Sequence, residues 1–230
     1  DTQLVVSHEP FISSAICRYP GGVQIPKETE KDLNMYHMTY QEIKAFDCGS
    51  LFNNDFLLQE KSRISKPLLI EVLDTIEQVA TAKGQLIHYN IELKSELALE
   101  GVYHPEVAVF CQVAYQAINH QVDWRRITIQ SFDFRILRYF NKYYPEVQLA
   151  LLIENKLSWE LNIDSLGFKP EIYSCEYALL SAETISELQE KNMKVIPWTV
   201  NDSLDMRQLI HWGVNGLITD YPNIALQIFN

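Results

Sequence analysis

Polar side chains occupy every second position of one short run, Asn90-Ile91-Glu92-Leu93-Lys94. In a strand, side chains alternate between the two faces, so the polar set shares one face and the apolar set the other. A carboxylate and an ammonium two residues apart then lie about 7 Å apart along the strand. Glu92 and Lys94 could therefore form a loose structural ion pair, or hold a metal-bound phosphate between them. The spacing leaves both interpretations open.

Two further side chains stand where apolar runs end. His8 follows Leu4-Val5-Val6-Ser7, and Trp198 follows Lys194-Val195-Ile196-Pro197. A lone histidine at a strand end is often a hydrogen-bonded structural group, but histidine also titrates near neutrality and can transfer protons. A tryptophan here is either a core residue or an apolar wall for a ligand. Strand periodicity lets both side chains point inward.

The ends of the other apolar runs also carry polar residues. Glu154 and Glu176 suit structural or rim positions better than ligand contact, and Asp220 suits the turn before Tyr221-Pro222. Polar groups that gather at the carboxyl ends of parallel strands are typical of α/β-barrel active sites. The set comprises Gln130, Glu154, Glu176, Asn201 and Asp220.

The four cysteines form no CxxC pair, which argues against a zinc or redox site. Buried thiols are the favoured interpretation. A disulfide between Cys17 and Cys48 is an alternative in an oxidising compartment.

Strand-like runs recur along the chain, and each precedes an amphipathic stretch. From Ile127 onward their starts lie 21 to 23 residues apart, which is the length of one strand, one helix and two loops. This rhythm predicts parallel strands joined by helices. The predicted strands are Gln85–Leu93, Ile127–Phe132, Gln148–Ile153, Glu171–Cys175, Lys194–Val200 and Gly216–Thr219, with Leu4–His8 as a seventh.

Capping residues delimit the predicted helices. Pro67 near a first helical position and Gly84 beyond the end bound one helix. Asp133 and Ser181 are predicted N-caps of two more, and either Asp202 or Ser203 caps the last full helix.

We predict a TIM (β/α)8-type barrel that spans residues 1–230 as a single domain, with a folded insertion at residues 10–65 after the His8 strand. Such a barrel needs eight strands and about 250 residues, so we expect its first strand to precede Asp1. An open doubly wound sheet would tolerate six strands, but no G-x-G-x-x-G turn supports dinucleotide binding. The insertion is expected to form a small cap around Phe11, Ile12, Tyr36, Phe46, Leu51 and Phe52.

Charge and hydropathy restrict the classes of partner. The net charge of −11 argues against a nucleic-acid surface. No run of about 18 apolar residues occurs, so we expect no membrane span. The compartment, cytoplasmic or periplasmic, and the oligomeric state stay open.

Five segments in order resemble motifs of the glycerophosphodiester phosphodiesterase family. Val5-Val6-Ser7-His8-Glu9-Pro10 resembles its V-V-x-H-D-P, and residues 90–94 resemble its N-I-E-x-K. Residues 131–133 resemble its S-F-D, residues 198–201 its W-T-V-N, and residues 213–222 its closing G-V-D-G-I-I-T-D-x-P. Each motif is weak alone, but the ordered set is specific.

The resemblance implies hydrolysis of a small glycerophosphodiester to glycerol 3-phosphate and an alcohol. It implies that His8 is one of two acid–base histidines, that Glu92 binds one divalent cation, Mg²⁺ or Ca²⁺, that Lys94 binds phosphate and that Trp198 lines the glycerol side. Glu9 stands where the family usually has Asp.

The family's H-R-G and E-x-D strands come before the His8 strand, and neither lies ahead of His8 here. We expect them upstream of Asp1. The alternatives are a related barrel phosphodiesterase for another head group or a lysophospholipid, and a ligand-binding barrel that has lost catalysis.

Overall fold

The computed structural model describes residues 1–54, 56–119 and 121–229. The chain divides into two compact units, each built from two stretches of sequence. The N-terminal unit comprises Asp1–Ile87 and Glu96–Asp123, and the sheet unit comprises His88–Ser95 and Trp124–Asn230. The assignment of residues 1–230 to one barrel domain stays a prediction.

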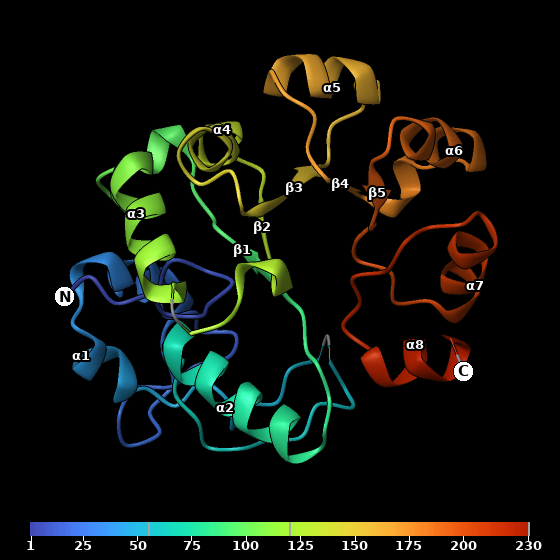
Figure 1. The fold of residues 1–230 in the computed structure, drawn as a ribbon. Helices are drawn as coiled ribbons and strands as arrows, with labels where there is room; N and C mark the ends of the chain where they lie inside the picture. Colours follow the sequence, from blue (N-terminus) through green and yellow to red (C-terminus); the bar gives the residue numbers. More distant parts are fainter. Residues whose placement is uncertain (55, 120, 230) are drawn as a thin grey trace. The chain divides into compact units, whose positions relative to one another are not determined.

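A parallel sheet with the order β1-β2-β3-β4-β5 forms the centre of the sheet unit (Figure 1). Every residue of β2 and β4 is buried, as is typical of parallel sheets covered on both faces. The spatial order follows the chain order, as in a barrel, whereas a doubly wound sheet reverses its order at a switch point. The strands are β1 (Tyr89–Glu92), β2 (Ile127–Ser131), β3 (Gln148–Ile153), β4 (Ile172–Cys175) and β5 (Lys194–Val195).

Helices of the sheet unit form an arc outside these strands (Figure 1). Asp133 and Ser181 cap their helices as predicted, and of the two candidates for α7 the cap is Asp202. Gly167 ends α5 in the left-handed conformation that glycine tolerates. The elements are η4 (Trp124–Arg126), α4 (Phe134–Tyr143), α5 (Trp159–Leu166), η5 (Tyr177–Leu179), α6 (Ala182–Glu190), α7 (Ser203–His211) and α8 (Pro222–Phe229).

Three predicted strands of this unit are shorter or less regular than expected. β1 begins at Tyr89 rather than Gln85, and β5 ends at Val195. Pairing with β4 nevertheless continues beyond Val195, because Ile196 N donates to Tyr173 O over 3.2 Å and Glu176 forms a parallel bridge with Trp198. Residues 216–219 are not a regular strand, but Ile218 N bonds Pro197 O and Val200 N bonds Ile218 O, both over 2.9 Å.

The regular elements of the N-terminal unit are helices, joined by long irregular segments. The predicted helix after Pro67 is α2, and Gly84 follows its end with φ +62°. Cys111, Ala114 and Ile118 form the buried face of α3, at helical spacing. The elements are η1 (Lys27–Asp32), η2 (Met35–His37), α1 (Tyr40–Lys44), α2 (Leu69–Ala82), η3 (Leu97–Leu99) and α3 (Val107–Ile118).

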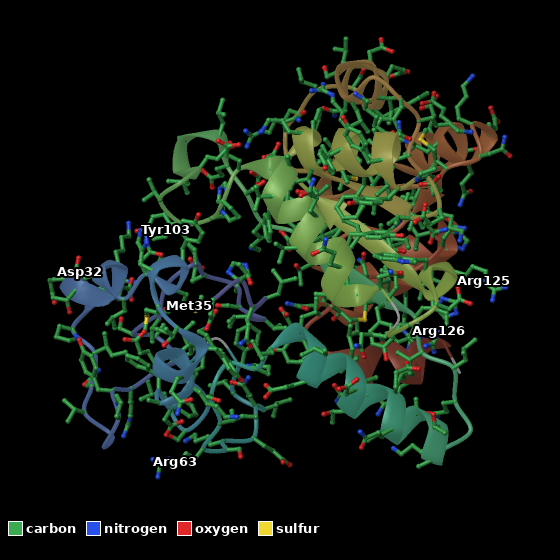
Figure 2. The ribbon with its side chains drawn as sticks, turned by 60° about the vertical axis from the view of Figure 1, so that its left-hand side comes forward. Asp32, Met35, Arg63, Tyr103, Arg125 and Arg126 are labelled. Atoms are coloured by element: carbon green, nitrogen blue, oxygen red, sulfur yellow. A yellow bond between two sulfur atoms is a disulfide. The ribbon has the colours of Figure 1, made fainter. Side chains whose placement is uncertain are left out.

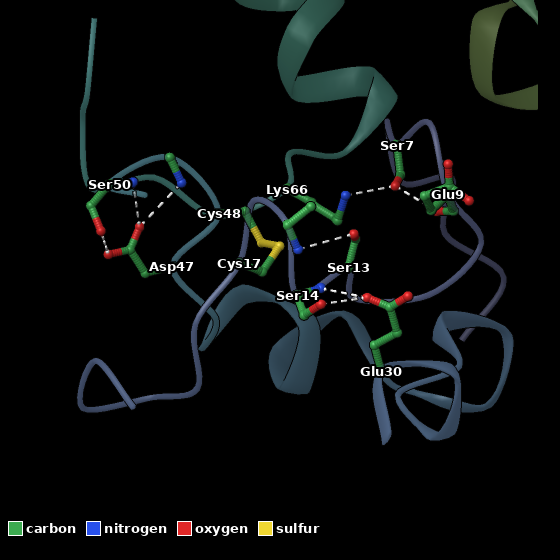
Figure 3. The surroundings of a disulfide bond; sticks show 12 residues. Ser7, Glu9, Ser13, Ser14, Cys17, Glu30, Asp47, Cys48, Ser50 and Lys66 are labelled. Atoms are coloured by element: carbon green, nitrogen blue, oxygen red, sulfur yellow. Dashed lines mark hydrogen bonds between the residues drawn. A yellow bond between two sulfur atoms is a disulfide. The ribbon is translucent and has the colours of Figure 1, made fainter. Parts of the chain in front are cut away.

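The predicted insertion has a small core of its own. Met35 of η2 packs against it (Figure 2), and a disulfide joins Cys17 to Cys48 (Figure 3). The expected core was partly wrong, because Tyr36 is 41% exposed and Phe52 is 50% exposed. The fully buried members are Ile12, Cys17, Ile25, Ile43 and Phe46.

The seventh predicted strand, Leu4–His8, is wrong. This segment forms a single antiparallel bridge, between Val5 and Leu68. Leu69 N bonds Leu4 O over 2.8 Å, and Val6 N bonds Pro67 O over 2.9 Å. The segment therefore pairs with the residues that lead into α2, rather than with a parallel strand, in the bonds that are seen.

Among the described residues, no helix is both long enough and apolar enough to cross a bilayer.

Candidate active site

The polar face of β1 has the predicted alternation. Tyr89 and Leu93 are buried, at 9% and 4% exposure, whereas the polar residues between and after them are more exposed. Glu92 Oε1 lies 3.8 Å from Lys94 Nζ, and the side chains are 25% and 40% exposed. The two groups therefore form a loose ion pair in which the Glu92 Oε1 atom is buried and the Lys94 side chain is partly exposed.

A neighbouring strand supports this face. Gln130 lies opposite Glu92 in the register of β1 and β2, and its Oε1 accepts a 2.7 Å hydrogen bond from Asn90 Nδ2. Leu93 N donates to Gln130 O over 2.9 Å, so the pairing of the two strands extends one residue beyond β1. This pairing holds Glu92 and Lys94 at the carboxyl end of the sheet, where barrel active sites lie.

Trp198 follows β5 at the same edge of the sheet. Its indole Nε1 donates to Ser174 O over 2.9 Å, and its backbone N donates to Cys175 O over 3.1 Å. Both bonds attach the residue to β4. Its ring stands edge-on to the ring of Phe132, with centroids 5.3 Å apart and planes at 84°. The partly exposed indole is therefore held in a fixed orientation.

Phe132 is a residue of this edge that the sequence reasoning missed. It directly follows β2, is 38% exposed and contacts Trp198. Its place in the S-F-D motif, directly before the predicted helix cap Asp133, is the signal that could have identified it. With Trp198 it presents an apolar corner beside the polar face of β1.

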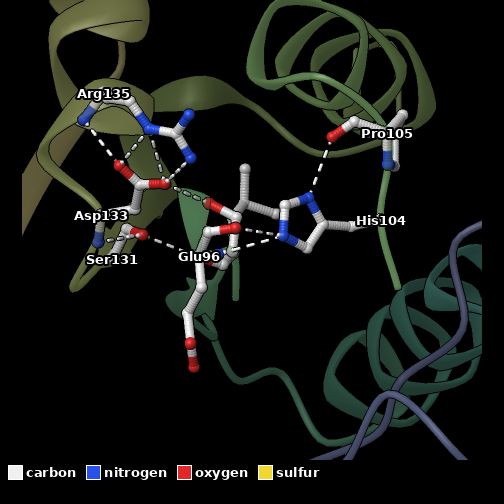
Figure 4. A network of polar contacts seen from close by, with 8 residues as sticks. Glu96, His104, Pro105, Ser131, Asp133 and Arg135 are labelled. Carbon is white, nitrogen blue, oxygen red and sulfur yellow. Dashed lines mark hydrogen bonds and ion pairs between the residues drawn. The ribbon is translucent and has the colours of Figure 1, made fainter. Parts of the chain in front are cut away.

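Asp133 fixes the backbone after Phe132 (Figure 4). Its carboxylate caps α4, pairs with Arg135 over 2.7 Å and accepts a 2.7 Å bond from Ser95 Oγ. Burial alone would raise the pKa of Asp133, but the hydrogen bonds from Arg135 and Ser95 bring it below its ordinary value. Asp133 is therefore an ionised structural group that links the segments after β1 and β2.

The remaining polar residues at strand ends have mixed roles. Asp220 Oδ2 accepts a 2.8 Å bond from Asn201 Nδ2, and Asp220 N donates to Asn201 Oδ1 over 3.0 Å. These bonds close the turn after residue 219, as predicted for Asp220. Glu176 forms a parallel bridge with Trp198, and Glu154 is exposed.

His8 belongs to the N-terminal unit. Its side chain is 80% exposed, and its Nδ1 lies 2.8 Å from Glu9 Oε1. A carboxylate at Nδ1 favours the N–H on that atom and leaves the lone pair of the neutral ring on Nε2. The arrangement suits a group that accepts and donates a proton.

Comparisons with known proteins agree with the motifs. Residues 1–224 match the glycerophosphoryl diester phosphodiesterase family. The chain belongs to this family. A glycerophosphodiester phosphodiesterase of Caldanaerobacter subterraneus is 30% identical over 194 residues, which cover 83% of this chain and 70% of the relative. One of Bacillus altitudinis is 28% identical and is matched over 83% of this chain and 71% of its own length.

The fold is that of solved phosphodiesterases. The structure of an Oleispira antarctica phosphodiesterase, in complex with the product sn-glycerol-3-phosphate, superposes on this chain with a TM-score of 0.74. The two chains are 19% identical, and the match covers 100% of this chain and 80% of the Oleispira chain. The TIM-barrel fold class predicted from the strand rhythm is therefore confirmed.

The family motif at residues 90–94 includes one carboxylate, that of Glu92, on the polar face of β1. Within residues 1–54, 56–119 and 121–229, no three His, Cys, Asp or Glu side chains gather in a group that could hold a metal ion. Glu92 offers the hard oxygen that Mg²⁺ and Ca²⁺ prefer, but such ions take six or more oxygen ligands, some of them water. Glu92 fits one ligand of such a site, and the described residues do not complete it.

Proposed function

We propose that this chain hydrolyses glycerophosphodiesters to sn-glycerol 3-phosphate and an alcohol. The observation that carries the proposal is the family match over residues 1–224. The product held by the Oleispira phosphodiesterase supports it, because that molecule is the one that such a hydrolysis releases.

Lys94 is the group proposed to bind the phosphate. A phosphodiester is an anion that repels nucleophiles, and the protein as a whole is strongly acidic, with a net charge of −11. The Lys94 ammonium lies at the carboxyl end of the sheet, where its 40% exposed side chain can reach a ligand. A positive charge there stabilises the charge that builds on the phosphoryl oxygens in the transition state.

Trp198 is proposed to contact the glycerol carbons. Its indole N–H is already bonded to Ser174, so the ring offers its apolar face rather than its polar atom. The contact with Phe132 keeps the ring from rotating. Such a wall binds the glycerol backbone and leaves its hydroxyl groups to polar neighbours.

His8 is proposed to transfer a proton to the alkoxide that leaves phosphorus when water attacks. Nε2 takes a proton from solvent before cleavage, and the imidazolium then donates that proton to the leaving oxygen, while the attacking water releases its own proton to solvent. While the ring is protonated, the Glu9 carboxylate beside Nδ1 stabilises its positive charge.

Glu92 is proposed as one ligand of a divalent cation, Mg²⁺ or Ca²⁺. Such a cation would supply positive charge to the phosphoryl oxygens when bound. Among the described residues, no group of three His, Cys, Asp or Glu side chains completes its coordination.

The test is release of glycerol 3-phosphate from glycerophosphocholine and glycerophosphoethanolamine by the protein, with Mg²⁺, with Ca²⁺ and with a chelator. We expect turnover that the chelator abolishes and that Glu92→Gln weakens together with cation affinity. Cation affinity that survives Glu92→Gln would contradict the role of Glu92. Hydrolysis of lysophospholipids alone would assign another head group, and binding without turnover would indicate a ligand-binding barrel.

A further inference from the structure

Lys66 is a buried charge in the N-terminal unit. Only 5% of the residue is exposed, and lysine is rarely buried to this extent without a partner. Its Nζ donates a 2.7 Å hydrogen bond to Ser7 Oγ (Figure 3). Burial lowers the pKa of Lys66, and the negative charge of Glu9 opposes that effect. The ammonium is therefore held against the segment that carries His8.

Two further bonds continue from Ser7 toward the imidazole. Ser7 Oγ donates to Glu9 O over 2.6 Å, which closes a tight turn around His8. Glu9 Oε1 then lies 2.8 Å from His8 Nδ1. The buried ammonium is thus connected to the histidine ring through the Ser7 hydroxyl and then through the covalent frame of Glu9, from its backbone O to its carboxylate.

Packing alone cannot orient His8, because its side chain is 80% exposed. Backbone bonds from Val6 to Pro67 and from Leu69 to Leu4 attach the preceding residues to the entry of α2. These bonds stop at Val6. Beyond it, the Lys66 side chain extends the attachment to Ser7, directly before His8.

We propose that Lys66 is the positioning residue of His8. Its ammonium fixes the Ser7 hydroxyl and, through it, the turn that sets the Glu9 carboxylate at Nδ1. The carboxylate in turn selects the Nδ1–H tautomer, whose lone pair on Nε2 is the one that proton transfer uses. The inference deepens the proposed function, since it rests on the proton-transfer role of His8.

The decisive variant is Lys66→Met, which keeps an unbranched buried side chain and removes the ammonium. The matched control is Lys83→Met, which makes the same charge change at the exposed residue after α2. ¹⁵N-histidine NMR reports the tautomer, with the His8 signals assigned by their loss in His8→Gln. We expect Lys66→Met to shift His8 from the Nδ1–H toward the Nε2–H tautomer and Lys83→Met to leave it unchanged.

Turnover is the second measurement. A misplaced proton-transfer group lowers kcat, so Lys66→Met should lose roughly tenfold to a hundredfold in kcat with KM unchanged. A folded Lys66→Met protein with the wild-type tautomer and wild-type kcat would overturn the proposal. Loss of stability alone, with both readouts unchanged, would overturn it too.

Ser7→Ala tests the same link if Lys66→Met does not fold. It breaks both hydrogen bonds of the hydroxyl and should cause the same tautomer shift, whereas a wild-type spectrum would contradict the inference. If the wild-type protein hydrolyses no phosphodiester, the proposed function fails, and the NMR spectra still decide whether Lys66 orients His8.

Discussion

The two units order their chain segments by different physical means. In the sheet unit, regular backbone ladders and covering helices bury whole strands, and β2, β3 and β4 contain no ion pair among the described interactions. In the N-terminal unit, long irregular segments surround a small core and are held by a disulfide and by charged side chains on backbone groups. A small apolar core releases too little free energy to order so much irregular chain, so cross-links and charged hydrogen bonds supplement it.

The largest expected effect comes from His8, which belongs to the N-terminal unit and is proposed to transfer a proton. His8→Ala should lower kcat by about 10²–10⁴, the usual contribution of a positioned acid or base. Circular dichroism and cation binding should stay as in the wild type. Near-normal turnover of glycerophosphocholine by this variant would show that His8 does not transfer the proton. The family resemblance of the N-terminal unit would then extend only to its fold.

Removal of the disulfide should lower the stability of the N-terminal unit and leave that of the sheet unit unchanged. The Cys17–Cys48 bond joins residues 31 positions apart, and a cross-link of that span contributes about 4 kcal/mol by restricting the unfolded chain. In the Cys17→Ser/Cys48→Ser variant, we expect amide hydrogen exchange to accelerate in residues 10–48 and to stay unchanged in β2 to β4. Cys111 and Cys175 are buried and take no part in the disulfide, so Cys111→Ala is the matched control. Equal acceleration in both units would contradict the comparison.

Acid should weaken the N-terminal unit through Glu30. Hydrogen bonds from Lys27 and Ser14 lower the pKa of this carboxyl from 4.5 to about 2. Because the pKa is depressed in the folded state, the contribution is complete above pH 4.5 and is lost as the pH falls toward 2. We expect the unfolding temperature of the wild type to drop across that interval more than that of Glu30→Gln. Parallel pH profiles of the two proteins would show that Glu30 does not contribute.

The smallest expected effect is that of Trp198→Ala. The variant removes contacts that a bound substrate keeps in both its ground state and its transition state, so KM should rise by about tenfold or less while kcat changes little. Phe132→Ala should act in the same direction but less strongly, because Phe132 also orients the indole. A fall in kcat with unchanged KM would move Trp198 out of the proposed binding role.

Local patterns predicted most of the sheet unit. The alternation from Tyr89 to Lys94 and the caps at Asp133 and Ser181 depend on residues a few positions apart, and the structure confirms them. The predicted strand Leu4–His8 was wrong because this segment pairs with Leu68, a residue far along the chain that leads into α2.

The sequence by itself determined the family, the strand order expected of a barrel, and the residue types at the ends of its strands. Ordered motifs and strand periodicity carry that information, since both are properties of neighbouring residues. Only the tertiary structure decided that Cys17 meets Cys48, that Phe132 meets Trp198 and that Lys66 reaches Ser7. Those partners lie 31, 66 and 59 residues apart. Their contacts form only when the whole unit has folded, because no local preference brings such distant residues together.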